Sequence, residues 1–115
     1  MQVILGDTCD PSAVLMRGMN ADVLVHEATH INANRELAIE KGHSTAGMAG
    51  NFAKRLNCST LLLNHFSTRI EQRAKFIMDS SFSIEKVLLE AKAEFDGRII
   101  PAMVQLFNIL GFSCL

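Results

Sequence analysis

The segments DVLVHE at residues 22–27 and TLLLNH at residues 60–65 share one pattern, a short apolar run that ends in chemically active side chains. Each run is apolar at successive positions rather than at alternate ones, as in a strand that is covered on both faces. Strands of this kind belong to sheets with helices packed against them. The two segments therefore predict an α/β fold with mostly parallel strand pairing.

Strands and helices alternate along the rest of the chain. Two further apolar runs, at 2–5 and 98–100, predict short strands near its two ends. Asn32, Ser44 and Ser83 are residue types that cap helices. The predicted helices cover residues 12–19, 33–41, 45–57 and 83–95. No repeat, linker or low-complexity stretch separates these elements, so we expect a single α/β unit.

The size and charge of the chain limit the classes of function. Its 115 residues suffice for one domain or for a piece of one. The formal net charge is −1, so the chain has no overall positive charge that would attract RNA. Any contact with RNA must therefore be local. The most apolar stretch, 99–115, is interrupted by Pro101, Gln105 and Asn108, and this makes it a poor membrane span. We expect no membrane association and interpret this stretch as a buried or partner-seeking tail.

The cysteines indicate the compartment. Cys9, Cys58 and Cys114 are odd in number, widely spaced and without a CxxC pair, which is typical of free thiols in a reducing compartment. Residues 1–8 have neither the basic region nor the long apolar region of a secretory signal. We therefore expect an intracellular protein. Because the first predicted strand begins directly after Met1, we also expect the chain to be part of a longer enzyme.

Acidic and imidazole side chains gather at the ends of the predicted strands. Asp7 follows the first strand, His26 and Glu27 follow the second, and His65 follows the third. His43 lies in the loop between the second and third strands, just before a predicted helix. In open α/β sheets, functional groups collect beyond the carboxyl ends of the strands. We therefore expect these five side chains to share one rim.

Each of these residues also has a purely structural explanation. Asp7 could cap a turn, and Glu27 could cap the segment that follows it. His43 could be an exposed loop residue, and His65 could be a core histidine with satisfied hydrogen bonds. Only their joint occurrence at successive strand ends and helix starts favours a functional site. His30 has no such placement, and we interpret it as structural.

The chemistry that this set favours is metal-assisted hydrolysis. Carboxylate oxygens and imidazole nitrogens are ligands that suit Zn²⁺, and a carboxylate can bridge two ions. Zinc lowers the pKa of a bound water to about 7, so hydroxide becomes available at neutral pH. A catalytic zinc site normally has three protein ligands. Two ligands do not make a zinc site, so the chain cannot complete such a site alone.

Four separated segments resemble the motifs of tRNase Z, a branch of the metallo-β-lactamase fold, in order and approximate spacing: GDT (6–8), HEAT (26–29), GHST (42–45) and NHFSTR (64–69). The segment AEFDGRIIPA at 93–102 is similar to the last helix end and strand of such domains. The resemblance covers residues 2–101. It implies that residues 1–101 form the C-terminal half of a four-layer αββα sandwich. The apolar tail, 102–115, has no counterpart and is unassigned.

The resemblance also implies an activity and the roles of individual residues. The family consists of zinc-dependent endoribonucleases that cleave the 3′ trailer from precursor tRNA. Asp7 would bridge two zinc ions, and His65 would bind one of them. His43 would lie near the scissile phosphate, where it would stabilise charge or protonate the leaving 3′ oxygen. Glu27 and His26 would orient or charge His43.

Further residues of the motifs would support the site. The resemblance implies that Thr8, Ser44 and Ser67 hold loops or contact the metal ligands. Arg69 would contact a phosphate, although a solvated loop arginine explains it equally well. Members of the family dimerise, so the complete enzyme is expected to be a homodimer with precursor tRNA as its substrate.

The chain departs from the family pattern in several places. It lacks the HxHxDH motif, which supplies most zinc ligands, and it lacks a further histidine ligand and the arm that grips tRNA. Ile70 stands where an aromatic residue usually follows the arginine. We therefore expect the isolated chain to be inactive unless another chain supplies the N-terminal half. Two alternatives stay open: another phosphodiesterase of the same fold, and a non-catalytic module that pairs with a complete subunit.

Overall fold

A parallel sheet forms the centre of the molecule. The computed structural model describes residues 1–64 and 84–102. The described strands pair in the order β1-β2-β3-β4, with every neighbouring pair parallel. They cover Gln2–Ile4 (β1), Val23–Glu27 (β2), Thr60–Asn64 (β3) and Arg98–Pro101 (β4). The predicted α/β fold with parallel pairing is confirmed.

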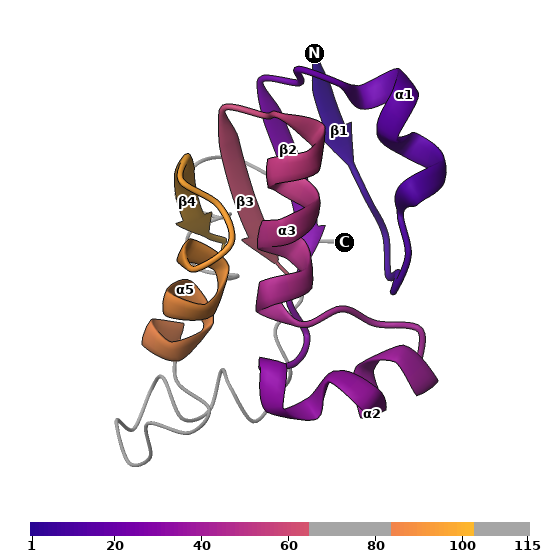
Figure 1. Ribbon diagram of the computed structural model, residues 1–115, viewed down its shortest axis with the longest axis vertical. Coiled ribbons are helices and arrows are strands. Elements are labelled where there is room, and N and C mark those ends of the chain that lie inside the picture. Colours follow the sequence, from indigo (N-terminus) through magenta and orange to yellow (C-terminus); the bar gives the residue numbers. More distant parts are fainter. Residues whose placement is uncertain (65–83, 103–115) are drawn as a thin grey trace.

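Helices pack against one face of this sheet (Figure 1). The described helices are α1 (Leu15–Gly18), α2 (Arg35–Glu40), α3 (Ala46–Leu56) and α5 (Ile84–Lys92). Short 3₁₀ turns precede the first two, η1 (Ser12–Val14) and η2 (Asn32–Asn34). Helices α3 and α5 approach closely at Gly50, where an added Cβ would lie 2.5 Å from the carbonyl oxygen of Ala91. A glycine is therefore needed at this crossing. No helix among the described residues is long and apolar enough to cross a membrane.

Two details differ from the sequence prediction at the helix starts. The side chain of Thr45, and not that of Ser44, caps α3, because its Oγ1 accepts a hydrogen bond from the Met48 amide at 3.2 Å. Asn32 begins η2 and does not cap a helix with its side chain. Its Oδ1 accepts a hydrogen bond from the Gly47 amide at 3.0 Å instead. This bond ties the start of α3 to the segment before α2.

The core lies between the sheet and α3. Leu24, Leu61 and Leu63 point from the strands into this layer and are fully buried. Phe52 and Leu56 meet them from α3 and are also buried. Successive residues of a strand point to opposite faces, so each strand contributes every second side chain to this layer.

The opposite face of the sheet is less well covered. Val25 and Leu62 alternate with the buried residues and are only partly buried, and Ile4 is 71% exposed. The unbroken apolar runs predicted strands that are covered on both faces, whereas within the described residues only one face is fully buried. We refer to Ile4, Val25 and Leu62 as the open sheet face.

We expect the 115-residue chain to self-associate in solution through the open sheet face, because exposed apolar patches drive association. Sedimentation velocity over a range of concentrations would measure this. Ile4→Lys should reduce association by placing a charge on that face. Met16→Lys is the matched control, because Met16 is 93% exposed but lies on the helical side. A monomer that stays dispersed at high concentration would contradict this expectation.

Candidate active site

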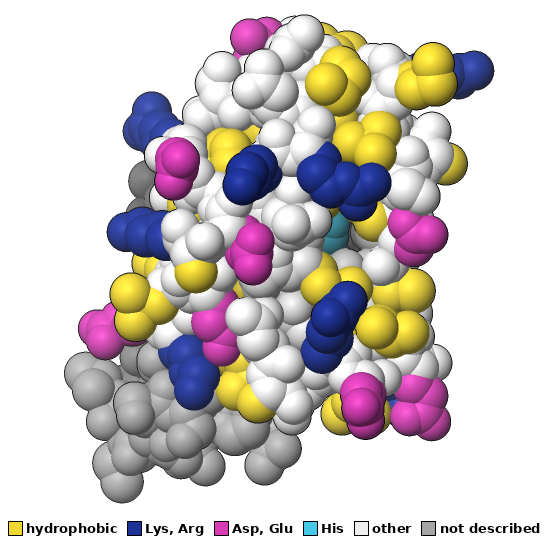
Figure 2. Space-filling view, in the orientation of Figure 1, with side chains coloured by type: hydrophobic (Ala, Val, Ile, Leu, Met, Phe, Trp, Pro, Cys, Tyr) yellow, Lys and Arg dark blue, Asp and Glu magenta, His cyan; other side chains and the backbone are white. Residues whose placement is uncertain are grey.

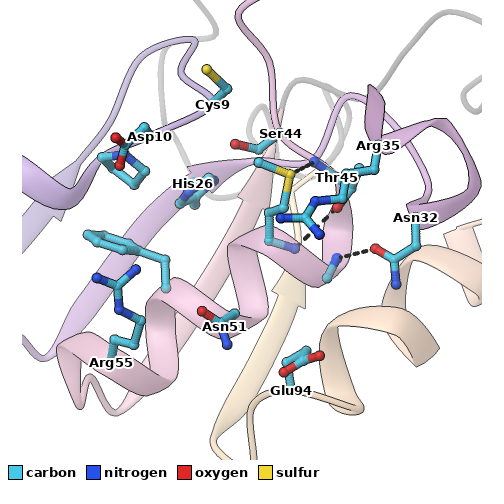
Figure 3. Close-up of a pocket in the computed structure, with 14 residues that line it drawn as sticks. Cys9, Asp10, His26, Asn32, Arg35, Ser44, Thr45, Asn51, Arg55 and Glu94 are labelled. Atoms are coloured by element: carbon cyan, nitrogen blue, oxygen red, sulfur yellow. Dashed lines mark hydrogen bonds between the residues drawn. The ribbon is translucent and has the colours of Figure 1, made fainter. Parts of the chain in front are cut away.

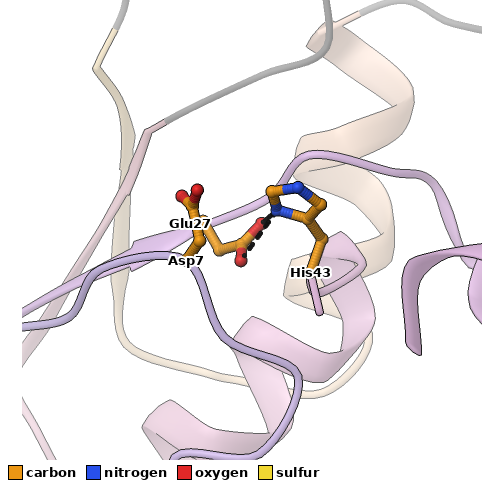
Figure 4. Close-up of side chains that lie close together, drawn as sticks. All are labelled: Asp7, Glu27 and His43. Carbon is orange, nitrogen blue, oxygen red and sulfur yellow. Dashed lines mark hydrogen bonds and ion pairs between the residues drawn. The ribbon is translucent and has the colours of Figure 1, made fainter. Parts of the chain in front are cut away.

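Three side chains meet beyond the carboxyl ends of β1 and β2. Asp7 lies in the loop after β1, Glu27 is the last residue of β2, and His43 precedes α3. One potential ligand atom of each lies within 4.8 Å of those of the other two (Figure 4). The structure therefore brings together three of the five side chains that the sequence predicted to share a rim.

Glu27 is the centre of this cluster. Its side chain is only 1% exposed, so the hydrogen bonds that its carboxylate oxygens accept come from the protein and not from water. Oε1 accepts from the Thr8 amide at 2.6 Å, and Oε2 accepts from the Thr29 hydroxyl at 2.5 Å. Nδ1 of His43 lies 3.1 Å from Oε2 and 3.3 Å from Oε1. A buried carboxylate requires such partners, and here they fix its position.

The contact with Glu27 sets the orientation of the His43 ring. An ionised carboxylate only accepts hydrogen bonds, so Nδ1 of His43 carries the proton that it donates. The other ring nitrogen, Nε2, then lies on the side away from Glu27 (Figure 4). This arrangement suits an imidazole that donates a proton from Nε2.

Thr8 and Ser44 hold the loops around the cluster. The hydroxyl of Ser44 donates a hydrogen bond to the carbonyl oxygen of Thr8. The amide of Thr8 in turn donates to Glu27. The loop after β1 and the loop before α3 are thus joined to each other and to the buried carboxylate.

The structure does not bring His26 into this cluster. His26 and Glu27 are consecutive on β2, so their side chains leave the strand on opposite faces. The His26 ring is 1% exposed and packs on Phe52, with ring centroids 5.8 Å apart. Its Nδ1 lies 2.8 Å from the carbonyl oxygen of Glu27. Burial lowers the pKa of His26, so the ring is neutral at pH 7.

His30 lies closer to the cluster than the sequence indicated. Its ring stands edge-on to that of His43, with centroids 6.1 Å apart. The pKa of His30 is lowered, first by burial and then by the neighbouring His43. A parallel bridge between His30 and Thr45 produces this contact. No spacing rule in the sequence reveals that bridge.

His65, Ser67 and Arg69 lie outside the described residues, as does Ile70. Their roles as metal ligand, loop support and phosphate contact stay predictions.

Comparisons with known proteins identify the family. No protein-family model matches the chain. The ribonuclease Z of Brevibacillus brevis is 43% identical over 109 residues, which cover 95% of this chain and 31% of that protein. The chain belongs to the ribonuclease Z family. It spans about a third of the length of the curated relatives that it matches.

Solved structures agree with this assignment. The short form of human tRNase Z superposes with a TM-score of 0.59 at 30% identity, over 86% of this chain and 29% of that one. The metallo-β-lactamase fold protein YhfI from Bacillus subtilis gives a TM-score of 0.70 at 23% identity, over 88% of this chain and 36% of that one. The second likeness concerns the fold alone. The predicted C-terminal half of a metallo-β-lactamase fold is confirmed.

We expect Glu27→Ala to destabilise the chain by about 3 kcal/mol, because it leaves the buried Thr29 hydroxyl and the half-buried donors of Thr8 and His43 without their acceptor. Urea unfolding of dilute protein, followed by circular dichroism, would measure the loss. Glu85→Ala is the control, because Glu85 is exposed on α5, and its effect should stay within about 0.5 kcal/mol. Equal effects of the two substitutions would show that the Glu27 network does not stabilise the fold.

Proposed function

We propose that this chain is the C-terminal part of a zinc-dependent endoribonuclease of tRNase Z type, which cleaves the 3′ trailer from precursor tRNA. The observation that carries the proposal is the buried Glu27 that holds His43 beside Asp7. The similarity to proteins named ribonuclease Z and to a human tRNase Z supports it. The activity belongs to the complete enzyme, because the chain spans about a third of its relatives.

The His43–Glu27 pair supplies the proton in this proposal. Hydrolysis yields a tRNA with a 3′-hydroxyl and a trailer with a 5′-phosphate, so the departing 3′ oxygen must gain a proton. His43 donates it from Nε2, while the carboxylate of Glu27 holds the ring in position through Nδ1. Thr8 and Thr29 keep Glu27 in place through their hydrogen bonds. The donor is thus preorganised before the substrate arrives.

The donor atoms of the site also fit zinc. Asp7 contributes an exposed carboxylate at the rim, a ligand type that zinc accepts. Both oxygens of Glu27 are engaged by Thr8, Thr29 and His43, so we assign it to the histidine and not to a metal. In the complete enzyme Asp7 and His65 would hold two zinc ions together with ligands from the rest of the protein. A bound zinc ion supplies the Lewis acidity that activates water at neutral pH.

Partners and location follow from the same proposal. The substrate is precursor tRNA, and the complete enzyme is a homodimer, as the family resemblance implies. The free thiols of Cys9 and Cys58 support an intracellular location, because such thiols persist in reducing compartments. The division between residues 1–101 and the tail 102–115 stays a prediction.

We expect the isolated chain to bind Zn²⁺ weakly, because Asp7 and His65 fall short of the three ligands of a catalytic zinc site. Extensive dialysis at neutral pH, followed by elemental analysis, would test this. Stoichiometric zinc that survives dialysis would mean that other residues, such as Cys9, complete a site.

In a complete enzyme that contains this segment, His43→Ala should lower turnover on precursor tRNA by roughly 10²–10⁴-fold, the usual loss on removing a general acid. Its zinc content should stay unchanged. Asp7→Ala should instead lose zinc and activity together. Elemental analysis and single-turnover cleavage would be measured side by side on both variants. The proposed role of His43 fails if His43→Ala removes zinc or leaves cleavage intact.

The choice of substrate separates the open alternatives. Another phosphodiesterase of the same fold would cleave a simple phosphodiester but not precursor tRNA. A non-catalytic module would bind a longer partner tightly through the open sheet face, and His43→Ala would not alter the partner's turnover. Cleavage of precursor tRNA that depends on His43 supports the proposed function over both.

A further inference from the structure

The helical side of the molecule does not point to a partner of one kind. Basic, acidic and apolar side chains are mixed over this face (Figure 2). The cavity on the same side is lined by two arginines and two carboxylates, so its charges select no ligand class; they are Arg35, Arg55, Asp10 and Glu94 (Figure 3). A ring contact beside the Glu27 cluster is more informative, because it involves the proposed proton donor.

The rings of His30 and His43 form an edge-to-face pair. Their centroids are 6.1 Å apart, and their planes are inclined at 65°. Aromatic pairs prefer this arrangement, with centroids about 4.5–7 Å apart. The His30 side chain is only partly buried, so its contact with His43 belongs to the site and not to the interior of the core.

The backbone holds His30 in this position. Its amide donates a hydrogen bond to the carbonyl oxygen of Ser44 at 3.3 Å, and its carbonyl oxygen accepts one from the Ala46 amide at 3.0 Å. These two bonds enclose the parallel bridge to Thr45, which lies next to Ser44 at the start of α3 (Figure 3). The segment that follows β2 is therefore fixed against the segment that carries His43.

The hydrogen-bonding groups of Glu27 and Thr29 approach the His43 ring at Nδ1. Oε2 of Glu27 lies 3.1 Å from this nitrogen, and the Thr29 hydroxyl oxygen lies 3.5 Å from it. Contacts at one atom fix that atom but allow the ring plane to tilt about it. A second ring that stands edge-on to the first opposes this tilt. Two restraints of different kinds therefore act on the His43 ring.

We propose that His30 is a positioning residue, whose ring keeps the imidazole of His43 in the orientation that directs Nε2 toward the substrate. Proton transfer requires the donor atom and the leaving oxygen to lie within hydrogen-bond reach, so this orientation affects the rate. The orientation of His43 can be measured without any cleavage, whereas its effect on catalysis rests on the proposed function.

His30 contributes a ring and not a charge. Burial, and then the neighbouring His43, lower the pKa of His30, so its ring is neutral at pH 7. A phenylalanine at this position should therefore replace it, whereas an asparagine should not, because asparagine keeps hydrogen-bonding groups but has no ring.

The first test measures the His43 ring by nuclear magnetic resonance relaxation in the dilute 115-residue chain. His30→Ala and His30→Asn should lower the order parameter of this ring from about 0.85, typical of rigid groups, to below about 0.6. His30→Phe should keep it in the rigid range. Leu37→Ala is the matched control, because it removes a 42% exposed side chain from α2, in the segment between the two histidines, and it should leave the order parameter unchanged.

The second test measures cleavage by a complete enzyme that contains this segment. His30→Ala and His30→Asn should lower the single-turnover rate at saturating precursor tRNA by about three- to tenfold, which corresponds to the loss of one aromatic pair. KM and zinc content should change less than about twofold, and circular dichroism should show native structure. His30→Phe should restore the rate to within about twofold of the original. A role in folding alone would lower the amount of native protein and not the rate of the native enzyme.

Three results would overturn the proposed role of His30: an unchanged His43 order parameter in His30→Ala, equal losses in His30→Phe and His30→Ala, or an equal loss in Leu37→Ala. A complete enzyme that does not cleave precursor tRNA would instead overturn the proposed function. The order parameter would still decide whether His30 positions His43, so the two failures can be told apart.

Discussion

The site depends on one buried carboxylate. Glu27 is almost fully removed from water at the end of β2, where an ionised group persists only if donors surround it. Its donors come from three separate segments, through Thr8, Thr29 and His43. The loop after β1 and the loop before α3 are therefore fixed by the same group that orients the His43 ring. The hydrogen bonds that satisfy this carboxylate are therefore also the contacts that orient His43 for the proposed catalysis.

His26 and Glu27, the last two residues of β2, place their side chains on opposite faces of the sheet. Glu27 points to the rim cluster, while His26 lies buried against Phe52 of α3. They remain linked, because Nδ1 of His26 contacts the carbonyl oxygen of Glu27. That contact fixes the tautomer of His26 and with it the unpaired Nε2. A movement of β2 at this point would therefore disturb the Glu27 cluster and the packing of His26 on Phe52 together.

Much of this arrangement could be predicted from sequence, and the failures have physical causes. Apolar runs located the strands and helices, although the predicted caps Asn32 and Ser44 were wrong, and the motif order located Asp7, Glu27 and His43. Assigning His26 to the cluster overlooked the alternation of a strand, which separates it from Glu27. The approach of His30 to His43 depends on a tertiary bridge with no local signal. His65 lies outside the described residues, so its prediction is untested.

Under the proposed function, the open sheet face and the small number of metal ligands among the described residues have one explanation. Relatives of this chain are about three times longer, and a sandwich of two sheets needs a second layer over Ile4, Val25 and Leu62. Ligands that complete a zinc site with Asp7 would then come from the layer that covers this face. In such a division this segment would contribute the His43–Glu27 pair, since Glu27 already has its hydrogen-bond donors within the described residues. Assembly would thus complete the proposed metal site around a histidine that is already oriented.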